Sequence, residues 1–346
     1  MSQFTSAEGE SFRKRLIATA KGARGARDMD REEAREALNF LMSAEAHAAQ
    51  AGAFLTAMRF KGARVEEMKG FLDAMEAQAT LIAPRVEGLL NCNGPYDGRK
   101  HALHLSLAAA VVTAAAGVPV VMHSNTGLPP KDGVTTARLL EALGIPAYRE
   151  PEQVARDIEE KGFGHLHASR FLHGVERLKP VRQVLFYRSF LHACEVMVNP
   201  AGARYSLLGA AHKGFLERFA SAAGERGQVR VMAVQGLDGS DELPLKPVAV
   251  AEYGGKGGIT EYILDPADYG IRHREHHPCE APGRTARLVE ETLRGGGEDH
   301  LDSVVYNAGV RLFLCGREEG IAAGIQRARE VIHSGQAAGK LAELRG

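Results

Sequence analysis

Three short stretches of the chain gather side chains that could bind an anion or a metal ion. In the first, NCNGPYDGRK at residues 91–100, the candidate ligand-binding residues are Gly94, Asp97, Gly98, Arg99 and Lys100. Glycine permits a close backbone approach, and arginine and lysine pair with phosphate oxygens. The stretch therefore favours a phosphate-binding loop, with an ordinary turn between a strand and a helix as the alternative.

The second stretch, MHSNTGLPPKDG at residues 122–133, places polar side chains directly after a predicted strand. Its candidate ligand-binding residues are His123, Asn125, Thr126 and Lys131. Both stretches follow a strand and open a helix, and in a parallel α/β sheet helix N-termini and free backbone N–H groups collect at this position. We therefore expect both loops to face the ligand.

The third stretch, GLDGSDEL at residues 236–243, follows another predicted strand and puts Asp238, Asp241 and Glu242 within five residues. Carboxylate oxygens are the ligands that Mg²⁺ prefers, often beside a phosphorylated substrate. The stretch indicates a magnesium site, and a solvated acidic turn is the alternative.

The chain must hold these loops in position with a run of N-terminal helices, followed by alternating strands and helices. Residues 7 to about 80 show helical periodicity, with Asp30 and Glu33 forming a capping-box pattern and Gly62 ending a helix. Beyond Val86, short apolar runs such as VPVVMH, GHLHAS and VRVMAVQG predict strands, separated by helices that include residues 103–116 and 206–224. This order predicts an α/β fold, with a small N-terminal helical domain and a large doubly wound α/β domain whose sheet is mostly parallel.

Composition narrows the classes of protein. The 346 residues carry 43 Lys and Arg against 43 Asp and Glu, which argues against a strong global field for nucleic acid or membrane. The four cysteines form no CxxC pair, as is typical of reduced thiols rather than a disulfide framework. No apolar leader or membrane-length apolar run is present, so we expect a cytoplasmic protein with no membrane partner.

The order of these pieces resembles the anthranilate phosphoribosyltransferase family, within the wider class that includes nucleoside phosphorylases. The segments that carry the resemblance, in family order, are DMDREEAREALNFLMSAEAHAAQAGAFLTAMRFKG, AAGVPVVMHSN, LLEALG, FLHGVERLKPVR, NPAG, DGSDEL, NAGVRLF and HSGQAAGKL. The resemblance implies a helical domain at 1–82 with roughly 172–198, which would mediate a homodimer. It also implies an α/β domain at 83–171 and 199–346, with a ligand cleft at the strand C-terminal ends.

Within that family, phosphoribosyl pyrophosphate (PRPP) binds with Mg²⁺, and a nitrogen nucleophile attacks C1 of the ribose while pyrophosphate leaves. The resemblance assigns Ser106, Asp241 and Glu242 to the metal. It places His123 and Asn125 after the second strand and His173 and Arg182 beside the acceptor. The expected ligand is therefore a phosphorylated ribose or another anion.

Several positions depart from the family pattern. Its Gly-Thr-Gly-Gly-Asp loop is matched by Gly94-Pro95-Tyr96-Asp97-Gly98, and its lysine before the histidine is Met122. Because proline lacks an N–H and Met122 lacks a charge, we expect a divergent branch without the usual pyrophosphate loop. That branch would be a Mg²⁺-dependent phosphoribosyltransferase acting on a nitrogenous acceptor other than anthranilate.

A second hypothesis is a non-catalytic nucleic-acid-binding protein on the same scaffold. It depends on basic residues that could line the cleft and its rim, namely Arg99, Lys100, Lys131, Arg138, Arg170, Arg177, Lys179, Arg182 and Arg188. Such a cleft would suit either a phosphorylated small molecule or a nucleic-acid backbone.

Overall fold

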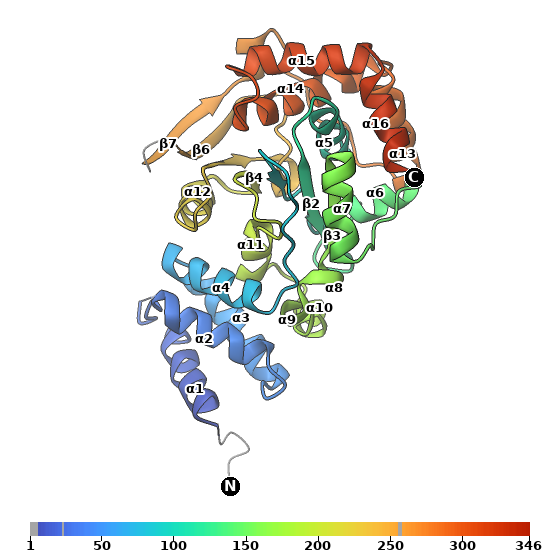
Figure 1. The fold of residues 1–346 in the computed structure, drawn as a ribbon. Helices are drawn as coiled ribbons and strands as arrows, with labels where there is room; N and C mark the ends of the chain where they lie inside the picture. Colours follow the sequence, from blue (N-terminus) through green and yellow to red (C-terminus); the bar gives the residue numbers. More distant parts are fainter. Residues whose placement is uncertain (1–5, 23, 255–257) are drawn as a thin grey trace.

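The chain begins with four helices, drawn in blue in Figure 1. A computed structural model describes residues 6–22, 24–254 and 258–346. The four helices are α1 (Ala7–Thr19), α2 (Arg31–Met42), α3 (Ala48–Lys61) and α4 (Val65–Ala77). The predicted capping box starts α2, because the Asp30 carboxylate accepts the Glu33 N–H at 2.8 Å and the Glu33 carboxylate accepts the Asp30 N–H at 3.1 Å. Gly62, with φ of 78°, ends α3 as expected.

A single seven-stranded sheet forms the centre of the larger part. Its strands are β1 (Leu90–Cys92), β2 (Val120–Ser124), β3 (Phe163–His167), β4 (Tyr205–Ala210), β5 (Arg230–Gln235), β6 (Val248–Gly254) and β7 (Gly258–Leu264). The order is β3-β2-β1-β4-β5-β6-β7, with β1 to β5 parallel and β6 and β7 antiparallel at one edge. This confirms the predicted α/β fold with a mostly parallel sheet.

Helices cover both faces of the sheet (Figure 1). The helices that follow β1 are α5 (Ser106–Ala115), α6 (Thr136–Ala142), α7 (Pro151–Lys161), α8 (Ala168–Phe171), α9 (His173–Glu176), α10 (Lys179–Leu185), α11 (Phe190–Met197), α12 (Leu216–Gly224), α13 (Pro282–Leu293), α14 (Glu298–Leu314), α15 (Ile321–His333) and α16 (Gln336–Leu344). Alternate residues of a strand enter different cores: Val121 joins the core shared with the N-terminal helices, whereas Val120 and Met122 join the core under α5 and α14. Two-sided burial explains why the parallel strands read as continuous apolar runs.

The prediction of one helix over residues 206–224 is wrong. Tyr205–Ala210 forms β4, and α12 begins only at Leu216. A short apolar run such as YSLLGA satisfies a buried strand as well as a buried helix turn, so its periodicity cannot separate them. The helix expected at 103–116 begins at Ser106, after a loop that contributes to the site.

Helices α10 and α11 pack on the N-terminal bundle. The Phe190 ring of α11 lies 4.2 Å from the Phe71 ring of α4 and 6.0 Å from the Phe54 ring of α3, measured between centroids. The division into domains at 1–82 with 172–198 and at 83–171 with 199–346 agrees with this packing but stays a prediction.

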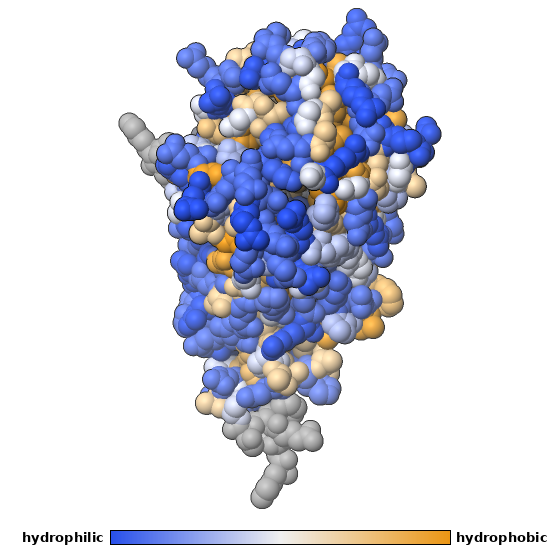
Figure 2. Space-filling view, turned by 45° about the vertical axis from the view of Figure 1, so that its right-hand side comes forward, coloured by the Kyte–Doolittle hydropathy of each residue, from blue (hydrophilic) through white to orange (hydrophobic). Residues whose placement is uncertain are grey.

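Within the described residues, none of the helices combines the length and the apolar character that a membrane crossing requires. The face of the molecule in Figure 2 is mainly hydrophilic, with small hydrophobic areas scattered across it.

Candidate functional site

The three predicted loops meet at the carboxyl ends of the parallel strands. The loop after β1 leads into α5, the loop after β2 leads into α6, and a short 3₁₀ turn, η2 (Leu237–Gly239), follows β5. The first two loops touch backbone to backbone, since a Cβ on Gly133 would lie 2.0 Å from the Arg99 carbonyl oxygen. Arg99 and Val134 also exchange two backbone hydrogen bonds of 3.0 Å. This edge, beside the switch in strand order at β1, is where open α/β sheets bind ligands.

A buried group that we call the sealed cluster comprises Arg99, Ser106, Asp241, Glu242 and Arg311. Arg311 Nη2 donates to Asp241 Oδ2 at 2.8 Å, and Arg99 Nη2 donates to Glu242 Oε2 at 2.7 Å. The Ser106 hydroxyl donates to Asp241 Oδ1 at 2.7 Å. All five residues are at most 1% exposed. Ser106, Asp241 and Glu242 therefore lie together as predicted, and two guanidinium groups accompany them.

Helix α14 holds the acidic pair in place through two residues one turn apart. Asn307 accepts the Leu243 N–H at 2.8 Å and donates to the Leu243 carbonyl at 3.0 Å, which fixes the backbone just after Glu242. Arg311, four residues on, reaches both Asp241 and the Ser106 carbonyl. Residues four apart share a helix face, so one face of α14 sets the position of both carboxylates.

The N-terminus of α5 also binds Glu242. Its Oε2 accepts the N–H groups of Leu105 at 3.1 Å and Ser106 at 2.7 Å, where the helix dipole favours a negative charge. Burial raises the pKa of Glu242, while Arg99 and these N–H groups favour its ionised form. Burial lowers the pKa of Arg311, but Cys92 and Asp241 more than offset this and raise it overall.

A more accessible group, the open cluster, comprises Asp97, Lys131, Arg188 and Asp238. Arg188 donates to both carboxylate oxygens of Asp97, with Nη2–Oδ1 at 2.6 Å and Nε–Oδ2 at 3.0 Å, and its side chain is 31% exposed. Lys131 Nζ lies 3.8 Å from Asp97 and 3.9 Å from Asp238. Burial lowers the pKa of Lys131 to about 8.

Asp238 occupies a concave stretch of backbone in the first loop. Its Oδ2 accepts three successive N–H groups, from Lys100 at 3.4 Å, His101 at 3.2 Å and Ala102 at 3.3 Å. Successive N–H groups that point at one spot form an anion-binding site. Lys100 is exposed at this rim, and its Nζ donates to the Pro130 carbonyl at 3.1 Å.

The second loop is held largely by its own neighbours. Asn125 donates to Glu176 Oε1 at 2.6 Å, and its Oδ1 accepts Lys179 Nζ at 3.0 Å and the Thr126 N–H at 2.8 Å. His123 is fully buried between the Tyr96 and Phe171 rings, at 5.6 Å and 6.1 Å between centroids. Burial lowers the pKa of His123 to about 3.

Two residues assigned to the acceptor by resemblance, His173 and Arg182, differ in exposure. His173 is exposed on α9, where its Nε2 lies 3.1 Å from the Thr80 hydroxyl. Arg182 is buried, and its terminal nitrogens donate to Glu195 at 2.7 Å and 2.6 Å. A role at the acceptor stays a prediction for both residues.

Sequence reasoning missed Arg311 and Glu195. A charged residue within an apolar stretch of helix, VRLFL for Arg311 and ACEVM for Glu195, was the available signal, because such residues are almost never fully buried without a partner. Their partners, Asp241 and Arg182, lie 70 and 13 residues away.

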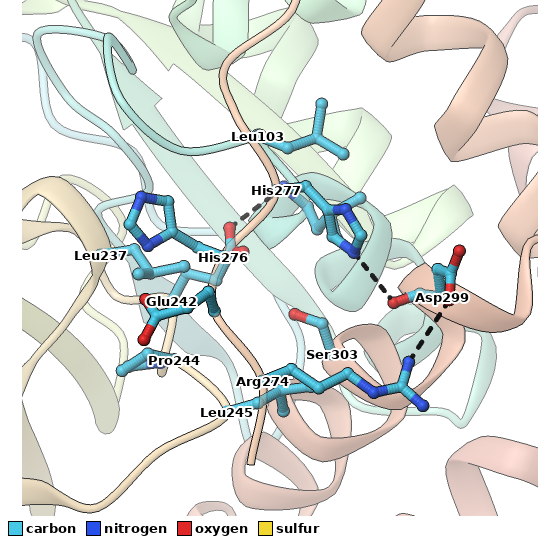
Figure 3. Close-up of a pocket in the computed structure, with 12 residues that line it drawn as sticks. Leu103, Leu237, Glu242, Pro244, Leu245, Arg274, His276, His277, Asp299 and Ser303 are labelled. Carbon is cyan, nitrogen blue, oxygen red and sulfur yellow. Dashed lines mark hydrogen bonds and ion pairs between the residues drawn. The ribbon is translucent and has the colours of Figure 1, made fainter. Parts of the chain in front are cut away.

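Figure 3 shows a hollow on the other side of Glu242, where His277 and Arg274 point toward Asp299 and His276 lies on the side of Leu237. The His277 ring Nε2 lies 3.2 Å from the Asp299 carbonyl oxygen. The hollow encloses about 20 Å³, room for a water molecule and too little for a nucleotide-sized substrate.

The sealed cluster does not fit a metal ion as it is arranged. Mg²⁺ needs oxygen ligands at about 2.0–2.1 Å and is commonly bound through one or two carboxylates plus substrate phosphates. Here each carboxylate already pairs with a guanidinium group, and the Ser106 oxygen accepts Arg311 Nη2 at 2.8 Å. Within the described parts of the chain, no three His, Cys, Asp or Glu side chains gather around one point that could hold an ion.

A helical bundle, a doubly wound α/β domain and charged loops at its strand ends define a class of glycosyl transferases. Residues 17–79 match the helical bundle domain of a glycosyl transferase family, and residues 97–338 match its a/b domain. An anthranilate phosphoribosyltransferase of Methylobacterium radiotolerans is 33% identical over 341 residues, 97% of this chain and 96% of that relative. An anthranilate phosphoribosyltransferase of Rubrobacter xylanophilus is 36% identical over 312 residues, which are 88% of this chain and 89% of that relative. The chain belongs to the anthranilate phosphoribosyltransferase family.

Solved structures support the same placement. The anthranilate phosphoribosyltransferase of Thermus thermophilus superposes with a TM-score of 0.85 at 31% identity, covering 97% of this chain and 98% of that one. The Saccharomyces cerevisiae enzyme in complex with PRPP and Mg has a TM-score of 0.81 at 19% identity, a likeness in fold alone. Structural relatives in this family thus bind Mg together with PRPP.

The prediction that anthranilate activity is unlikely is wrong. The relatives named above carry that activity in their names and resemble this chain at 31–36% identity over nearly its whole length. The expectation of another acceptor rested on a few loop positions, yet Gly94 and Gly98 keep the turn, with φ of 54° and 93°. The alternative of a non-catalytic nucleic-acid-binding protein is overturned by the same relatives, because they are enzymes.

Proposed function

We propose that this protein transfers the phosphoribosyl group of PRPP to the amino nitrogen of anthranilate. The observation that carries this proposal is the likeness to anthranilate phosphoribosyltransferases across nearly the whole chain, with 33% identity over 341 residues to one relative. In the reaction, the bond from C1 of the ribose to the diphosphate breaks and a bond from C1 to nitrogen forms. The amine loses a proton, and the diphosphate leaves with the bonding electrons.

Protein groups in such a reaction position the substrates and stabilise charge on the leaving group. We propose that the first loop, Gly94 to Lys100, and the N–H groups of Lys100, His101 and Ala102 bind the diphosphate. The Asp238 carboxylate occupies those N–H groups at 3.2–3.4 Å, so the diphosphate would replace one anion by another there. Pro95 and Tyr96 alter the loop without removing it, and Lys131 supplies a charge that Met122 lacks.

Magnesium enters this proposal with the donor. A diphosphate chelates Mg²⁺ through its own oxygens, and the structure of the yeast relative holds both PRPP and Mg. Bound in that way, the ion would neutralise part of the leaving group's charge.

Transfer is tested by incubating the purified chain with PRPP, Mg²⁺ and anthranilate, and following both the loss of anthranilate fluorescence and the release of pyrophosphate. We expect the two signals to move together and to need all three additions. The Thermus thermophilus relative, run in parallel, checks the assay. A folded chain that releases no pyrophosphate under conditions where that relative turns over would refute the proposal.

We also propose that the chain forms a homodimer through its helical domain. Three large apolar side chains are exposed on α3 and α10: Phe60 at 78%, Val184 at 68% and Phe186 at 74%. Helix α10 and the residues after it pack on α3, where the Thr56 and Tyr187 hydroxyls are hydrogen-bonded.

Light scattering should give twice the chain mass, and the double variant Phe60→Ser/Phe186→Ser should give a monomer. A monomeric wild-type chain would reject this assembly.

A further inference from the structure

The sealed cluster balances its own charge. Asp241 and Glu242 bring two negative charges, and Arg99 and Arg311 bring two positive charges, all of them at most 1% exposed. Arginine stays charged even when buried, and its planar fork matches carboxylate geometry. A divalent cation carries the same total charge as two guanidinium groups, and it would need the same oxygens.

Each guanidinium is anchored on more than its carboxylate. Arg311 Nη1 donates to the Ser106 carbonyl at 2.9 Å and Nη2 to the Ser106 hydroxyl at 2.8 Å. Arg99 Nη1 donates to the Leu237 carbonyl. Arg99 comes from the loop after β1 and Arg311 from α14, so the two cations approach the acidic pair from different elements. Their positions do not depend on a ligand.

Adding a metal ion to this arrangement would leave an excess of two positive charges in a buried place. An uncompensated buried charge is costly, and several hydrogen bonds would break to free the oxygens. Ser106 illustrates this, because its hydroxyl already donates to Asp241 Oδ1 at 2.7 Å and accepts from Arg311.

We propose that Arg99 and Arg311 take the place of a divalent cation at Asp241 and Glu242, so that the chain alone binds no metal ion at this acidic pair. The acidic pair is then an internal support that joins the first loop, α5 and α14. Mg²⁺ would reach the site only on a diphosphate. The inference concerns the chain without substrate, and it stands or falls independently of the acceptor.

The first experiment uses the full chain without substrate and Mn²⁺ as the probe, because carboxylate and water ligands suit both Mn²⁺ and Mg²⁺. Electron paramagnetic resonance measures free Mn²⁺ as it is titrated into the protein. We expect the signal to rise as it does in buffer, with no saturable site. Saturable binding that disappears in Asp241→Asn would overturn the proposal.

A second experiment asks whether removing a guanidinium creates a metal site. Arg311→Met leaves Asp241 without its cation, and Mn²⁺ should raise the Tm of this variant by a few degrees while leaving wild type unchanged. Arg182→Met is the matched control, because it breaks another buried pair, that of Arg182 with Glu195. Unlike Asp241, Glu195 has no acidic residue next to it in the sequence. We expect Mn²⁺ to leave its Tm unchanged.

The proposal that the guanidinium groups replace a metal ion would be rejected if Mn²⁺ did not stabilise Arg311→Met. It would also be rejected if Mn²⁺ stabilised Arg311→Met and Arg182→Met equally. If Arg311→Met does not fold, the titration of the wild-type chain still decides the matter.

Discussion

The sealed and open clusters are built from the same kinds of residue at the same edge of one sheet, yet they differ in exposure and in geometry. In the sealed cluster the ion pairs of Arg99 and Arg311 are 2.7 and 2.8 Å long, and every partner is at most 1% exposed. In the open cluster Arg188 pairs with Asp97 at 2.6 Å but is 31% exposed, and Lys131 stands 3.8 and 3.9 Å from its carboxylates.

This difference indicates that the two clusters have different tasks. Tightly paired buried charges cannot be lost singly without a large cost, so the sealed cluster holds the loops in position. In the open cluster, Arg188 is partly exposed and Lys131 stands away from both of its carboxylates, so these two cations are the ones that an incoming anion could contact. The candidate site therefore combines a rigid support with an adaptable rim.

The largest expected effect comes from breaking the sealed cluster. Arg99→Met leaves Glu242 buried without its guanidinium partner, and we expect a loss of about 3–5 kcal/mol in the free energy of unfolding. Urea denaturation followed by circular dichroism measures it. A loss under about 1 kcal/mol would mean that Glu242 is neutral or solvated in the folded chain.

The next largest effect is expected at Lys131 of the open cluster. If Lys131 binds the donor's diphosphate, Lys131→Gln removes a charge-assisted hydrogen bond worth about 1.5–3 kcal/mol, or about ten- to a hundredfold in KM for PRPP. Steady-state kinetics measure this, and Lys246→Gln, at an exposed position outside the site, serves as the matched control. Equal KM values for the two variants would place the diphosphate elsewhere.

The pH dependence of stability tests the burial of two histidines of β3, His165 and His167. Burial lowers the pKa of His165 to about 4 and that of His167 to about 3. As pH falls below about 6.5, the unfolded chain binds protons that the folded chain does not, so stability falls by up to about 1.4 kcal/mol per pH unit for each histidine.

The variant His165→Gln should therefore lose less stability between about pH 7 and about pH 5 than wild type does. Urea unfolding at the two pH values measures the difference. Identical pH dependence in variant and wild type would show that His165 binds its proton as readily in the folded chain as in the unfolded chain, despite its contacts with the Ser124 hydroxyl at 2.9 Å and the Ala147 carbonyl at 3.1 Å.

The smallest effect is expected from the counterpart of Arg99 in the open cluster. Arg188→Met breaks the pair with Asp97, but Arg188 is itself 31% exposed and Lys131 remains 3.8 Å from that carboxylate, so the loss of stability should be smaller than that of Arg99→Met. The measurement is the same urea denaturation as for Arg99→Met. A loss as large as that of Arg99→Met would remove the distinction between the clusters.

Local patterns predicted much of the fold. The capping box at Asp30, the end of α3 at Gly62 and the parallel core strands follow from spacing and residue type alone. Strand β4 escaped detection because its sequence, YSLLGA, lacks the β-branched residues that marked β2 and β5, which are also buried. Without such residues a short apolar run cannot be told from a turn of buried helix.

The site was predicted in part for a similar reason. Asp241 and Glu242 were found because residue type and position at a strand end carry information, whereas Ser106 was assigned through the resemblance to the family. Arg99 was expected to bind phosphate and instead pairs with Glu242, and Arg311 was not found, since pairing across 70 residues or more depends on the tertiary fold. The acceptor was misjudged because departures at Pro95, Tyr96 and Met122 were given more weight than the likeness of the whole chain.

The backbone contact between Gly98 and Gly133 has a consequence for protein engineering. A Cβ on Gly98 would lie 2.4 Å from the Gly133 carbonyl carbon, so neither position tolerates a side chain while the other loop stays where it is. A first loop grafted from a relative would therefore clash or lose support unless the second loop were exchanged with it. The two loops form one transplantable unit, and natural variants should inherit them as a pair.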